Sequence, residues 1–530
     1  MSLLILFCAI VIFSCMITNK FSSKLGVPAL VFFMFMGVLF GSDGILKISF
    51  DDYDLTSKLC SIGLLFIIFY GGFCTKKPAS NRITTQAVLL SSLGTIFTAG
   101  FCTLFCYYVL KISFAESFII GAVISSTDAA SVFSILRSKR LNLKYNTAPI
   151  LEMESGSNDP FAYILTLVGI AFLQGQNISM LSGLFFKQII FGVFFGILIA
   201  KTAIYIFKKT KLLTQNSDVL FITAIALASF SIPDLLNGNG FLSVYITGFI
   251  LGNSEIKNKI NLIHFFDGIT ALFQVVIFFL IGFLSFPHKI PEILMPAILI
   301  TAFLSFIARP LAVAIILKPF SATKNQIFYI SCAGLRGAAS IVFAILVVAQ
   351  NSSLAQDLFH IVFVVVLLSI TIQGTLLPYF AKISSMIDRY ADVRKTFNDY
   401  QQESAITLNK IHLKETHPWI GCNLKDVMIS DNALILAINR NNKRIIPNGQ
   451  TKFKAFDEIL IGTTYSQSEE DLNLCETNID TQHEWLNKQI REINCPNDFL
   501  IALIKRDEKY FVPNGATKIR LNDTIVFYES

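Results

Sequence analysis

Residues 152–160 read Glu-Met-Glu-Ser-Gly-Ser-Asn-Asp-Pro, and they lie within a longer, mainly apolar stretch between residues 147 and 173. A helix that crosses a bilayer needs about 20 mainly apolar residues. If this helix begins near Thr147, Asp159 lies about 18 Å along it, near the middle of a hydrocarbon core about 30 Å thick. A charge at that depth is costly unless it is paired or hydrated. The stretch therefore predicts a membrane protein with a functional carboxylate inside a span.

The rest of the first 385 residues follows the same pattern. Of the 530 residues, 53% are hydrophobic and 15% are charged, whereas an ordinary soluble domain carries about 25% charged residues. We predict a polytopic α-helical membrane protein with about thirteen spans, arranged as inverted repeats with crossed, broken helices and followed by small α+β cytoplasmic modules. Two short segments also allow a count of twelve. The expected spans are 2–18, 27–41, 58–75, 85–110, 113–136, 147–173, 183–207, 217–233, 238–253, 264–285, 292–317, 324–350 and 355–382.

Lysine and arginine are concentrated in every second loop between these spans. The positive-inside rule assigns the basic loops to the cytoplasm. The N-terminus is then outside, the tail after Lys382 is inside, and we expect a multi-pass protein of the plasma or inner membrane. The net charge of +7 comes mostly from these loops and does not indicate a nucleic-acid partner. The basic set comprises Lys20/Lys24, Lys76/Lys77/Arg82, Arg137/Lys139/Arg140/Lys144, Lys208/Lys209/Lys211, Lys257/Lys259 and Lys318/Lys324.

Two further spans carry charges at mid-depth. The fifth contains Ser125-Ser126-Thr127-Asp128, and the twelfth contains Gly334-Leu335-Arg336-Gly337. Asp128 and Arg336 lie about 20 Å and 18 Å into their helices. Small and capping residues make both stretches poor helix, so we expect a break in each span. Broken helices that meet at the midplane from opposite faces are how many secondary transporters build an ion site.

Spacing in the sixth span separates a functional from a structural interpretation. Ser155 and Asp159 are four residues apart and share a helix face, and Glu154 and Asn158 share the adjoining face. Buried polar groups can simply hold helices together, and this interpretation is favoured for Glu154 with Arg336. Asp159 has no dedicated cationic partner in the sequence. A hydrated carboxylate can bind a proton or a metal ion in turn, so function is favoured there.

At these residues the sequence resembles the monovalent cation:proton antiporter family, in its NhaP branch. The resemblance covers nearly the whole membrane half and implies a homodimer with crossed, interrupted fifth and twelfth helices. It implies that the cation and the proton compete for Asp159, and that Glu154 pairs with Arg336. The Asn-Asp pair is similar to that of the electroneutral branch, which exchanges one cation for one proton. The residues that would shape the site are Asn158, Asp128, Ser155 and Thr127, the last through its carbonyl. The motifs that carry the resemblance are Ser126-Thr127-Asp128-Ala129-Ala130, Glu154-Ser155-Gly156-Ser157-Asn158-Asp159-Pro160 and Gly334-Leu335-Arg336-Gly337-Ala338.

One position departs from the pattern of related potassium-type antiporters. In Phe69-Tyr70-Gly71-Gly72-Phe73, Tyr70 stands where those antiporters carry an acid before Gly-Gly. A phenol has a pKa of about 10 and is at best a neutral ligand. A carboxylate from the third span is therefore not expected, and the cation preference stays open.

The tail contains an internal repeat. Segments aligned without a gap match Trp419 to Trp485, an offset of 66 residues, and also match Arg440 to Arg506 and Asp457 to Asp523. Short β-rich runs alternate with Pro-Asn-Gly turns, which favour tight reversals. We expect strands at 433–438, 458–461 and 524–528, and short amphipathic helices near 423–429 and 486–493. We divide the chain into a membrane domain (1–384), a linker (385–405) and two modules (406–467 and 468–530).

Each module resembles the TrkA-C domain, the ligand-binding half of potassium-transport regulators. The pattern that carries this resemblance is a Trp, an Arg before a Pro-Asn-Gly-x-Thr turn, and an Asp that leads the last strand. It implies regulation by a small cytoplasmic ligand and favours K⁺ over Na⁺. No Gly-rich dinucleotide fingerprint precedes the modules. Alternatively, the modules only dimerise or stabilise the chain.

The main alternative function is a ligand-gated monovalent cation channel. A channel usually shows a carbonyl-lined filter or a pore motif, and the sequence contains neither. A membrane enzyme would need a catalytic constellation near the midplane carboxylates, but His264, His288 and His360 lie near span ends. We therefore predict an antiporter without a resident cofactor or metal, whose partners are a monovalent cation and H⁺.

Overall fold

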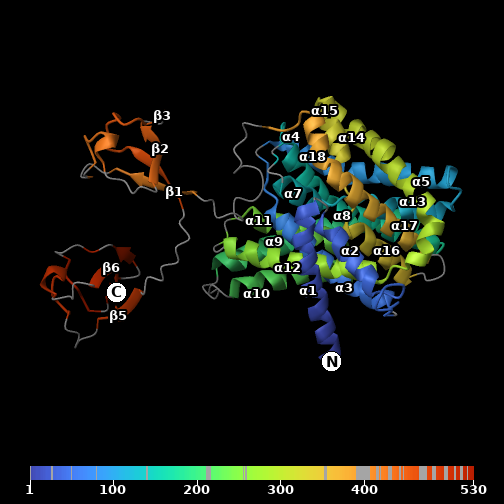
Figure 1. The fold of residues 1–530 in the computed structure, drawn as a ribbon, viewed down its shortest axis with the longest axis horizontal. Coiled ribbons are helices and arrows are strands. Elements are labelled where there is room, and N and C mark those ends of the chain that lie inside the picture. Colours follow the sequence, from blue (N-terminus) through green and yellow to red (C-terminus); the bar gives the residue numbers. More distant parts are fainter. Residues whose placement is uncertain are drawn as a thin grey trace. The chain divides into compact units, whose positions relative to one another are not determined.

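The computed structural model divides the chain into two compact units, residues 1–402 and 403–530, and each unit is described by itself (Figure 1). The described residues of the first unit run from 2 to 388 without 26–27, 49, 79, 139–140, 142, 210–216, 255, 257–258 and 351–354. Those of the second run from 406 to 529 without 414–416, 418, 428–432, 441–442, 446, 465–473, 480–484, 494–498, 507–508, 512, 514–516 and 522.

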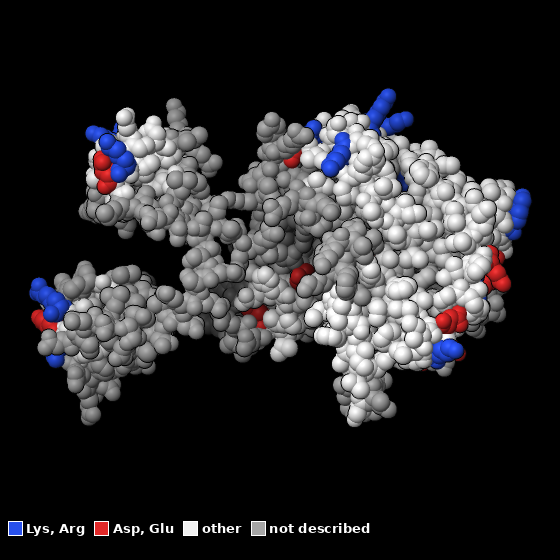
Figure 2. All heavy atoms as spheres, viewed as in Figure 1, with Lys and Arg blue, Asp and Glu red and all other residues white. Residues whose placement is uncertain are grey.

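The first unit is a bundle of helices, and each of the thirteen predicted spans falls on a helix or an interrupted helix. Among the described residues, eight helices are long and apolar enough to cross a membrane, and shorter apolar helices accompany them. Charged side chains are sparse on the described surface of this unit and lie mostly along its rim in Figure 2. The helices are α1 (Ser2–Leu25), α2 (Ala29–Phe40), α3 (Tyr53–Cys74), α4 (Asn81–Leu89), α5 (Thr95–Tyr108), α6 (Phe114–Val123), α7 (Ala129–Ser138), α8 (Thr147–Leu173), α9 (Ile178–Lys209), α10 (Ser217–Leu235), α11 (Gly240–Gly252), α12 (Lys259–Phe283), α13 (Ile290–Phe303), α14 (Arg309–Leu317), α15 (Lys324–Cys332), α16 (Ala338–Gln350), α17 (Ala355–Leu368) and α18 (Gly374–Ile383).

The two predicted helix breaks are confirmed. The fifth span is α6 and α7, separated by residues 124–128, and the twelfth is α15 and α16, separated by residues 333–337. The non-helical segments meet, because the Asp128 N–H donates to the Leu335 carbonyl over 2.8 Å. Backbone groups freed by unwinding must find partners inside a membrane protein. The two breaks supply a partner to each other.

Three long spans contain a π-helical turn. The segments are η1 (Leu90–Gly94) between α4 and α5, η3 (Leu304–Ala308) between α13 and α14, and η5 (Ser369–Gln373) between α17 and α18. Such turns are rare and occur mostly as short bulges, often near functional sites. No periodic signal in the sequence marks these turns, and the apolar stretches predict uninterrupted spans at these positions.

Close helix packing depends on small residues in a core rich in phenylalanine. Gly248 and Gly252 of α11 face the backbone of Phe69 and Phe73 on α3, so that any Cβ at either glycine would collide with backbone atoms. Close approach of this kind is typical of membrane helices. It fixes α3 against α11 and so sets the position of Tyr70, which follows Phe69.

The second unit contains two sheets of equal topology, in accordance with the predicted repeat. Their strand orders are β1-β4-β2-β3 and β5-β8-β6-β7, and β2 and β6 each carry a register shift at the corresponding place. The predicted strands are therefore confirmed. The first sheet comprises β1 (Ile406–His412), β2 (Ala433–Arg440), β3 (Lys443–Ile445) and β4 (Glu458–Thr464), and the second comprises β5 (Leu474–Asn478), β6 (Phe499–Arg506), β7 (Lys509–Phe511) and β8 (Thr524–Glu529).

The predicted short helices of the tail are wrong in extent. Within 423–429 and 486–493 the structure has only single 3₁₀ turns, η7 (Leu424–Asp426) and η8 (Ile490–Glu492). Antiparallel bridges from Asn423 to Lys452 and from Gln489 to Lys518 hold the residue before each turn in an extended conformation. A longer helix would have to break these bridges. Residues 428–429 lie outside the described part of the chain.

The repeated Arg and Asp residues form the same ion pair in both modules. Arg440 Nε and Nη2 donate to the two carboxylate oxygens of Asp457 over 2.7 and 2.6 Å, and Arg506 contacts Asp523 over 2.7 Å at both nitrogens. Burial raises the pKa of each aspartate, but bonds from the arginine and from a backbone N–H outweigh burial. The net pKa of each aspartate is therefore lowered.

Candidate functional site

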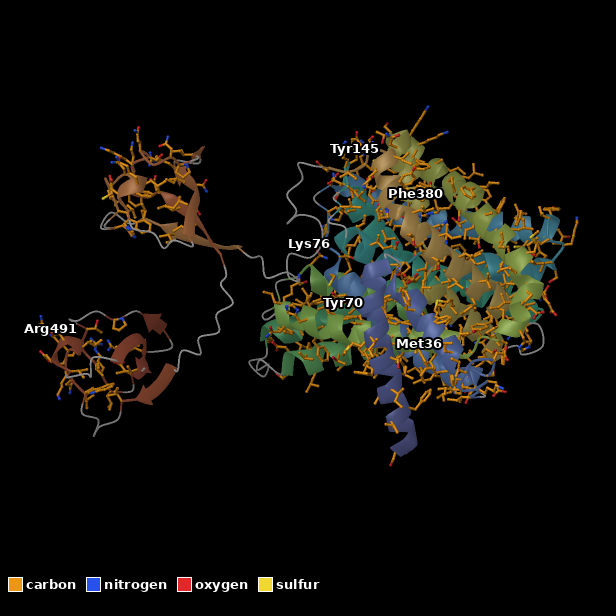
Figure 3. The ribbon with its side chains drawn as sticks, viewed as in Figure 1. Met36, Tyr70, Lys76, Tyr145, Phe380 and Arg491 are labelled. Carbon is orange, nitrogen blue, oxygen red and sulfur yellow. The ribbon has the colours of Figure 1, made fainter. Side chains whose placement is uncertain are left out.

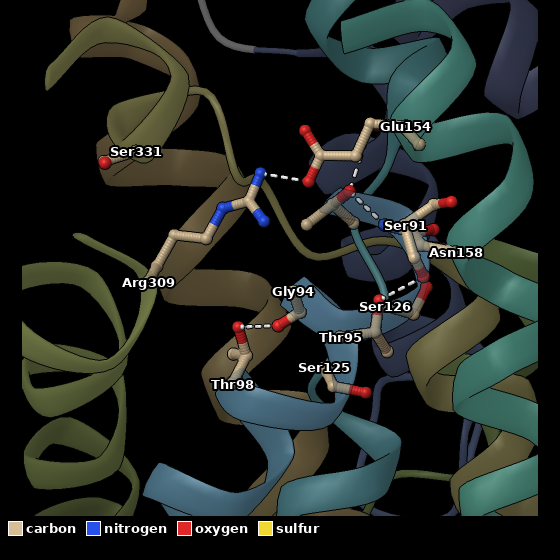
Figure 4. A network of polar contacts seen from close by, with 12 residues as sticks. Ser91, Gly94, Thr95, Thr98, Ser125, Ser126, Glu154, Asn158, Arg309 and Ser331 are labelled. Carbon is tan, nitrogen blue, oxygen red and sulfur yellow. Dashed lines mark hydrogen bonds and ion pairs between the residues drawn. The ribbon is translucent and has the colours of Figure 1, made fainter. Parts of the chain in front are cut away.

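Asp159 of α8 faces the break between α6 and α7. The Ser126 hydroxyl donates a hydrogen bond to Asp159 Oδ1. Asp159 is half-buried, while Ser126 is buried. The sixth span thus presents its carboxylate to the unwound segment of the fifth. Figure 4 labels Ser126, which follows α6, and Asn158 of α8, which precedes Asp159.

Three further predicted site residues form a hydrogen-bonded group beside Asp159. Asn158 Nδ2 donates to the Thr127 hydroxyl, and Thr127 Oγ1 lies 2.9 Å from Ser155 Oγ. All three side chains are buried. The amide oxygen of Asn158 has no hydrogen-bond partner among the described residues. A buried amide oxygen without a partner is costly, and it is a suitable ligand for a hard cation.

Asp128 stands where the two breaks cross. Its N–H bonds to the Leu335 carbonyl, and its Oδ2 accepts a hydrogen bond from Ser131. A Cβ at Gly337 would collide with the Asp128 side chain. The half-buried Asp128 is therefore fixed by contacts with both broken helices, and the absence of a side chain at Gly337 makes the crossing possible.

Arg336 neutralises the end of α6. Its Nη1 donates to the carbonyls of Ser125 and Ser126 over 2.7 and 2.8 Å, and its backbone N–H donates to Ser369 Oγ over 3.1 Å. Carbonyls that follow a helix C-terminus lack intrahelical partners and carry partial negative charge. An arginine is well placed there. It also fixes the backbone of Ser126, whose hydroxyl contacts Asp159.

The predicted ion pair between Glu154 and Arg336 is corrected by the structure. Glu154 Oε1 pairs instead with Arg309 Nη2, at the start of α14 (Figure 4), and both side chains are buried, 0% and 4% exposed. The physical reason is that the Arg336 guanidinium is directed to the carbonyls at the end of α6. Sequence reasoning missed Arg309 as a partner, although an arginine within the eleventh span was a visible signal.

Tyr70 has a carboxylate partner after all. Its hydroxyl donates to Asp267 Oδ1 of α12 over 2.8 Å, across 197 residues of sequence. Figure 3 labels Tyr70 within the membrane unit. The third span lacks the acid of related antiporters, and the tenth span supplies a carboxylate that accepts a hydrogen bond from Tyr70. Asp267 was not singled out because it lies near the predicted start of that span, where a charge is unremarkable.

The arrangement at α8 and the two breaks is suited to small cations. A carboxylate, several hydroxyls and an amide oxygen converge within a membrane domain, and oxygen atoms are the ligands that alkali cations and protons share. Asp159, Ser126, Asn158, Thr127 and Ser155 are brought together directly. Glu154 and Arg336 border the same region through different partners.

Comparison with known proteins decides the family. The model of the transmembrane sodium/hydrogen exchanger family matches residues 9–383. The chain belongs to the sodium/hydrogen exchanger family. This exchanger is therefore a cation/proton antiporter, and the channel alternative is not supported.

Individual relatives agree with this assignment. The exchanger is 29% identical over 450 residues to the K(+)/H(+) antiporter NhaP of Alkalimonas amylolytica, covering 84% of this chain and 78% of the relative. It is 30% identical over 447 residues to the K(+)/H(+) antiporter NhaP2 of Shewanella sp. (strain ANA-3), covering 83% and 77%. It resembles in fold the solved sodium proton antiporter MjNhaP1 of Methanocaldococcus jannaschii, with a TM-score of 0.63 and 20% identity, covering 72% of this chain and 99% of that one.

The tail also has a family. The TrkA-C domain model matches residues 411–469 and 476–528 of the exchanger. The two matches coincide with the two sheets, so the resemblance predicted from the repeat is confirmed.

Proposed function

We propose that this exchanger moves one monovalent cation against one proton, with K⁺ favoured and Na⁺ as the alternative cation. The observation that carries the proposal is the carboxylate of Asp159, which meets the unwound segment of the fifth span. Beside it lies the buried amide oxygen of Asn158, which has no hydrogen-bond partner in the described part of the chain. Asp159 binds either the cation or the proton, and the two compete.

The charge of the site makes the exchange electroneutral. A single carboxylate is neutralised equally by one proton and by one monovalent cation, so both loaded states carry the same charge. The neighbour Asn158 contributes an oxygen without adding a second charge. Thr127, Ser155 and Asp128 shape the site, while Arg336 and Arg309 balance the remaining charge around it.

Two observations support potassium. The relatives NhaP and NhaP2 are named K(+)/H(+) antiporters, and the tail carries two TrkA-C domains. Sodium remains the alternative, because the relative NhaH of Halobacillus aidingensis, 27% identical over 350 residues, is named a Na(+)/H(+) antiporter.

We infer the assembly of the exchanger from the family resemblance and its orientation in the membrane from the charges of its loops. The exchanger is a homodimer of the plasma or inner membrane, with the N-terminus outside and the tail in the cytoplasm. The linker 385–405 joins the membrane domain to the modules 406–467 and 468–530, which bind a small cytoplasmic ligand and alter transport. The alternation of basic loops in the sequence supports this orientation.

The test is a flux assay on the full chain in proteoliposomes. An outward gradient of K⁺ should acidify the lumen, because a proton enters for each cation that leaves, and a potential-sensitive dye should show no voltage change. Gradients of Li⁺, Na⁺ and Rb⁺ rank the cations. A cation flux that moves no protons contradicts antiport, and proton movement with a voltage signal contradicts the one-for-one ratio.

A further inference from the structure

The helices of the last third of the membrane domain form a large groove that contains none of the residues of the transport site. It has a volume of about 840 Å³ and is lined by α13, η3, α14, the turn from α14 to α15, α15, α17, η5 and α18. These helices lie on one side of the membrane unit in Figure 1, and Phe380, one of the lining residues, is labelled in Figure 3. The volume lies in the range of sites that hold a small molecule.

The groove is apolar along its walls and basic at one end. Phe306 is 81% exposed and Ile372 is 50% exposed, while Lys318 and Lys324 line the end formed by the turn from α14 to α15. Both lysines are exposed, and no carboxylate pairs with either of them among the described residues. Both lysines lie in one of the basic loops that the positive-inside rule assigns to the cytoplasm. An amphipathic anion with long apolar chains fits this distribution of charge.

We propose that this groove binds an anionic phospholipid, with its headgroup phosphate at Lys318 and Lys324 and an acyl chain along the apolar walls. Basic pockets between membrane helices on the cytoplasmic side are suited to acidic headgroups. A second copy of this chain is a poorer occupant. A two-fold contact presents the same patch from both sides, so it would bring four lysines together.

The wall of the groove is connected to the helix break. Gln373 of η5 donates to Ser305 of η3, and both residues line the groove. Gln373 Oε1 accepts from Ser369 Oγ over 2.7 Å, and Ser369 Oγ in turn accepts from the Arg336 N–H. A lipid in the groove would therefore contact side chains that are two hydrogen bonds from the α15–α16 break. Its occupancy is expected to change the exchange rate as well as stability.

The test measures lipid binding to the full chain after delipidation in detergent. Native mass spectrometry counts bound phosphatidylglycerol and phosphatidylcholine, and thermal melting measures the stabilisation that each lipid gives. We expect phosphatidylglycerol to bind and to raise the melting temperature, and phosphatidylcholine to do so weakly. The double variant K318Q/K324Q should lose affinity for phosphatidylglycerol by about 30-fold, the effect expected of two lysines near an anionic headgroup.

Two further variants distinguish binding in the groove from binding to the basic surface in general. K76Q/K77Q removes two exposed lysines from another loop of the basic set and should bind phosphatidylglycerol as the parent does. Ala314→Phe places a ring in the groove and should reduce adducts of both lipids.

Equal binding of the two lipids by the parent would overturn the proposal, and so would unchanged binding by K318Q/K324Q. If K76Q/K77Q loses as much affinity as K318Q/K324Q, the interaction is with the basic surface in general and the groove is not the site. If K318Q/K324Q changes the oligomeric state but not the lipid binding, the groove is a contact surface for a second copy of the chain.

Discussion

Removing the Arg309 side chain should destabilise the membrane domain strongly. Arg309→Met leaves the Glu154 carboxylate without its ion-pair partner, and that carboxylate is 0% exposed. Breaking a buried pair by removing one partner costs about 3–5 kcal/mol, because an uncompensated charge remains in a medium of low dielectric. The double variant Glu154→Gln/Arg309→Met removes both charges at nearly constant volume. It should therefore recover more than half of the loss.

The assay is equilibrium unfolding in mixed micelles, supported by thermal melting of the purified full chain. Lys201→Met is the matched control, because it removes an exposed cation from α9, and it should change stability by less than about 0.5 kcal/mol. A second comparison tests which arginine is the partner. Glu154→Gln should rescue Arg309→Met but not Arg336→Met, whose loss arises from the carbonyls of Ser125 and Ser126.

Either of two results would contradict an ion pair between Glu154 and Arg309. The first is an Arg309→Met variant as stable as the parent. The second is a larger rescue by Glu154→Gln in the Arg336→Met background than in the Arg309→Met background, which would restore the pairing inferred from sequence.

Three further predictions concern the crossing and the tail. Gly337→Ala should lower the free energy of unfolding by about 1–3 kcal/mol and slow exchange, because the new Cβ would displace Asp128. Gly100 faces open space, so Gly100→Ala should do neither, and equal melting curves for the two variants would contradict the prediction. In Arg440→Met, hydrogen exchange at β4 of the full chain should be faster than in the parent at pH 7. The lowered pKa of Asp457 contributes stability above its unfolded pKa of about 4 that is lost as the pH falls, so this difference should shrink below about pH 4; a difference independent of pH would contradict the role of the pair. Deleting the chain after about Tyr390 should leave a domain that exchanges ions with an altered response to pH or to cytoplasmic nucleotides; profiles that superimpose on those of the full chain under all conditions would exclude regulation by the tail.

The helix breaks could be predicted because their cause is local. Ser125-Ser126-Thr127-Asp128 consists of residues that favour caps and turns over helix interiors, and Gly334 and Gly337 weaken the helix on both sides of Leu335-Arg336. Both stretches interrupt otherwise apolar spans. The same holds for the tail, where a repeated pattern predicted strands that the structure contains. The conformational preference of the local sequence was sufficient to predict an element wherever the packing of the folded chain favours the same conformation.

Partners across the bundle could not be predicted, because they depend on how helices pack. Arg336 and Arg309 both lie within spans, and the family resemblance assigns Arg336 to Glu154 without pointing to Arg309. The choice is made by the direction of each side chain from its helix, which sequence periodicity does not give. Tyr70 and Asp267 are 197 residues apart, and their contact depends on how α3 packs against α12.

One measurement tests directly whether the cation and the proton compete for Asp159. Cation-driven proton movement is recorded in proteoliposomes that contain the parent, Asp159→Asn or Asp234→Asn, each at equal amounts of folded protein. Asp234 is an exposed carboxylate of α10 and serves as the control. We expect Asp159→Asn to abolish exchange for every monovalent cation, whereas Asp234→Asn should exchange normally. Coupled exchange at the parental rate in a folded Asp159→Asn variant would contradict it.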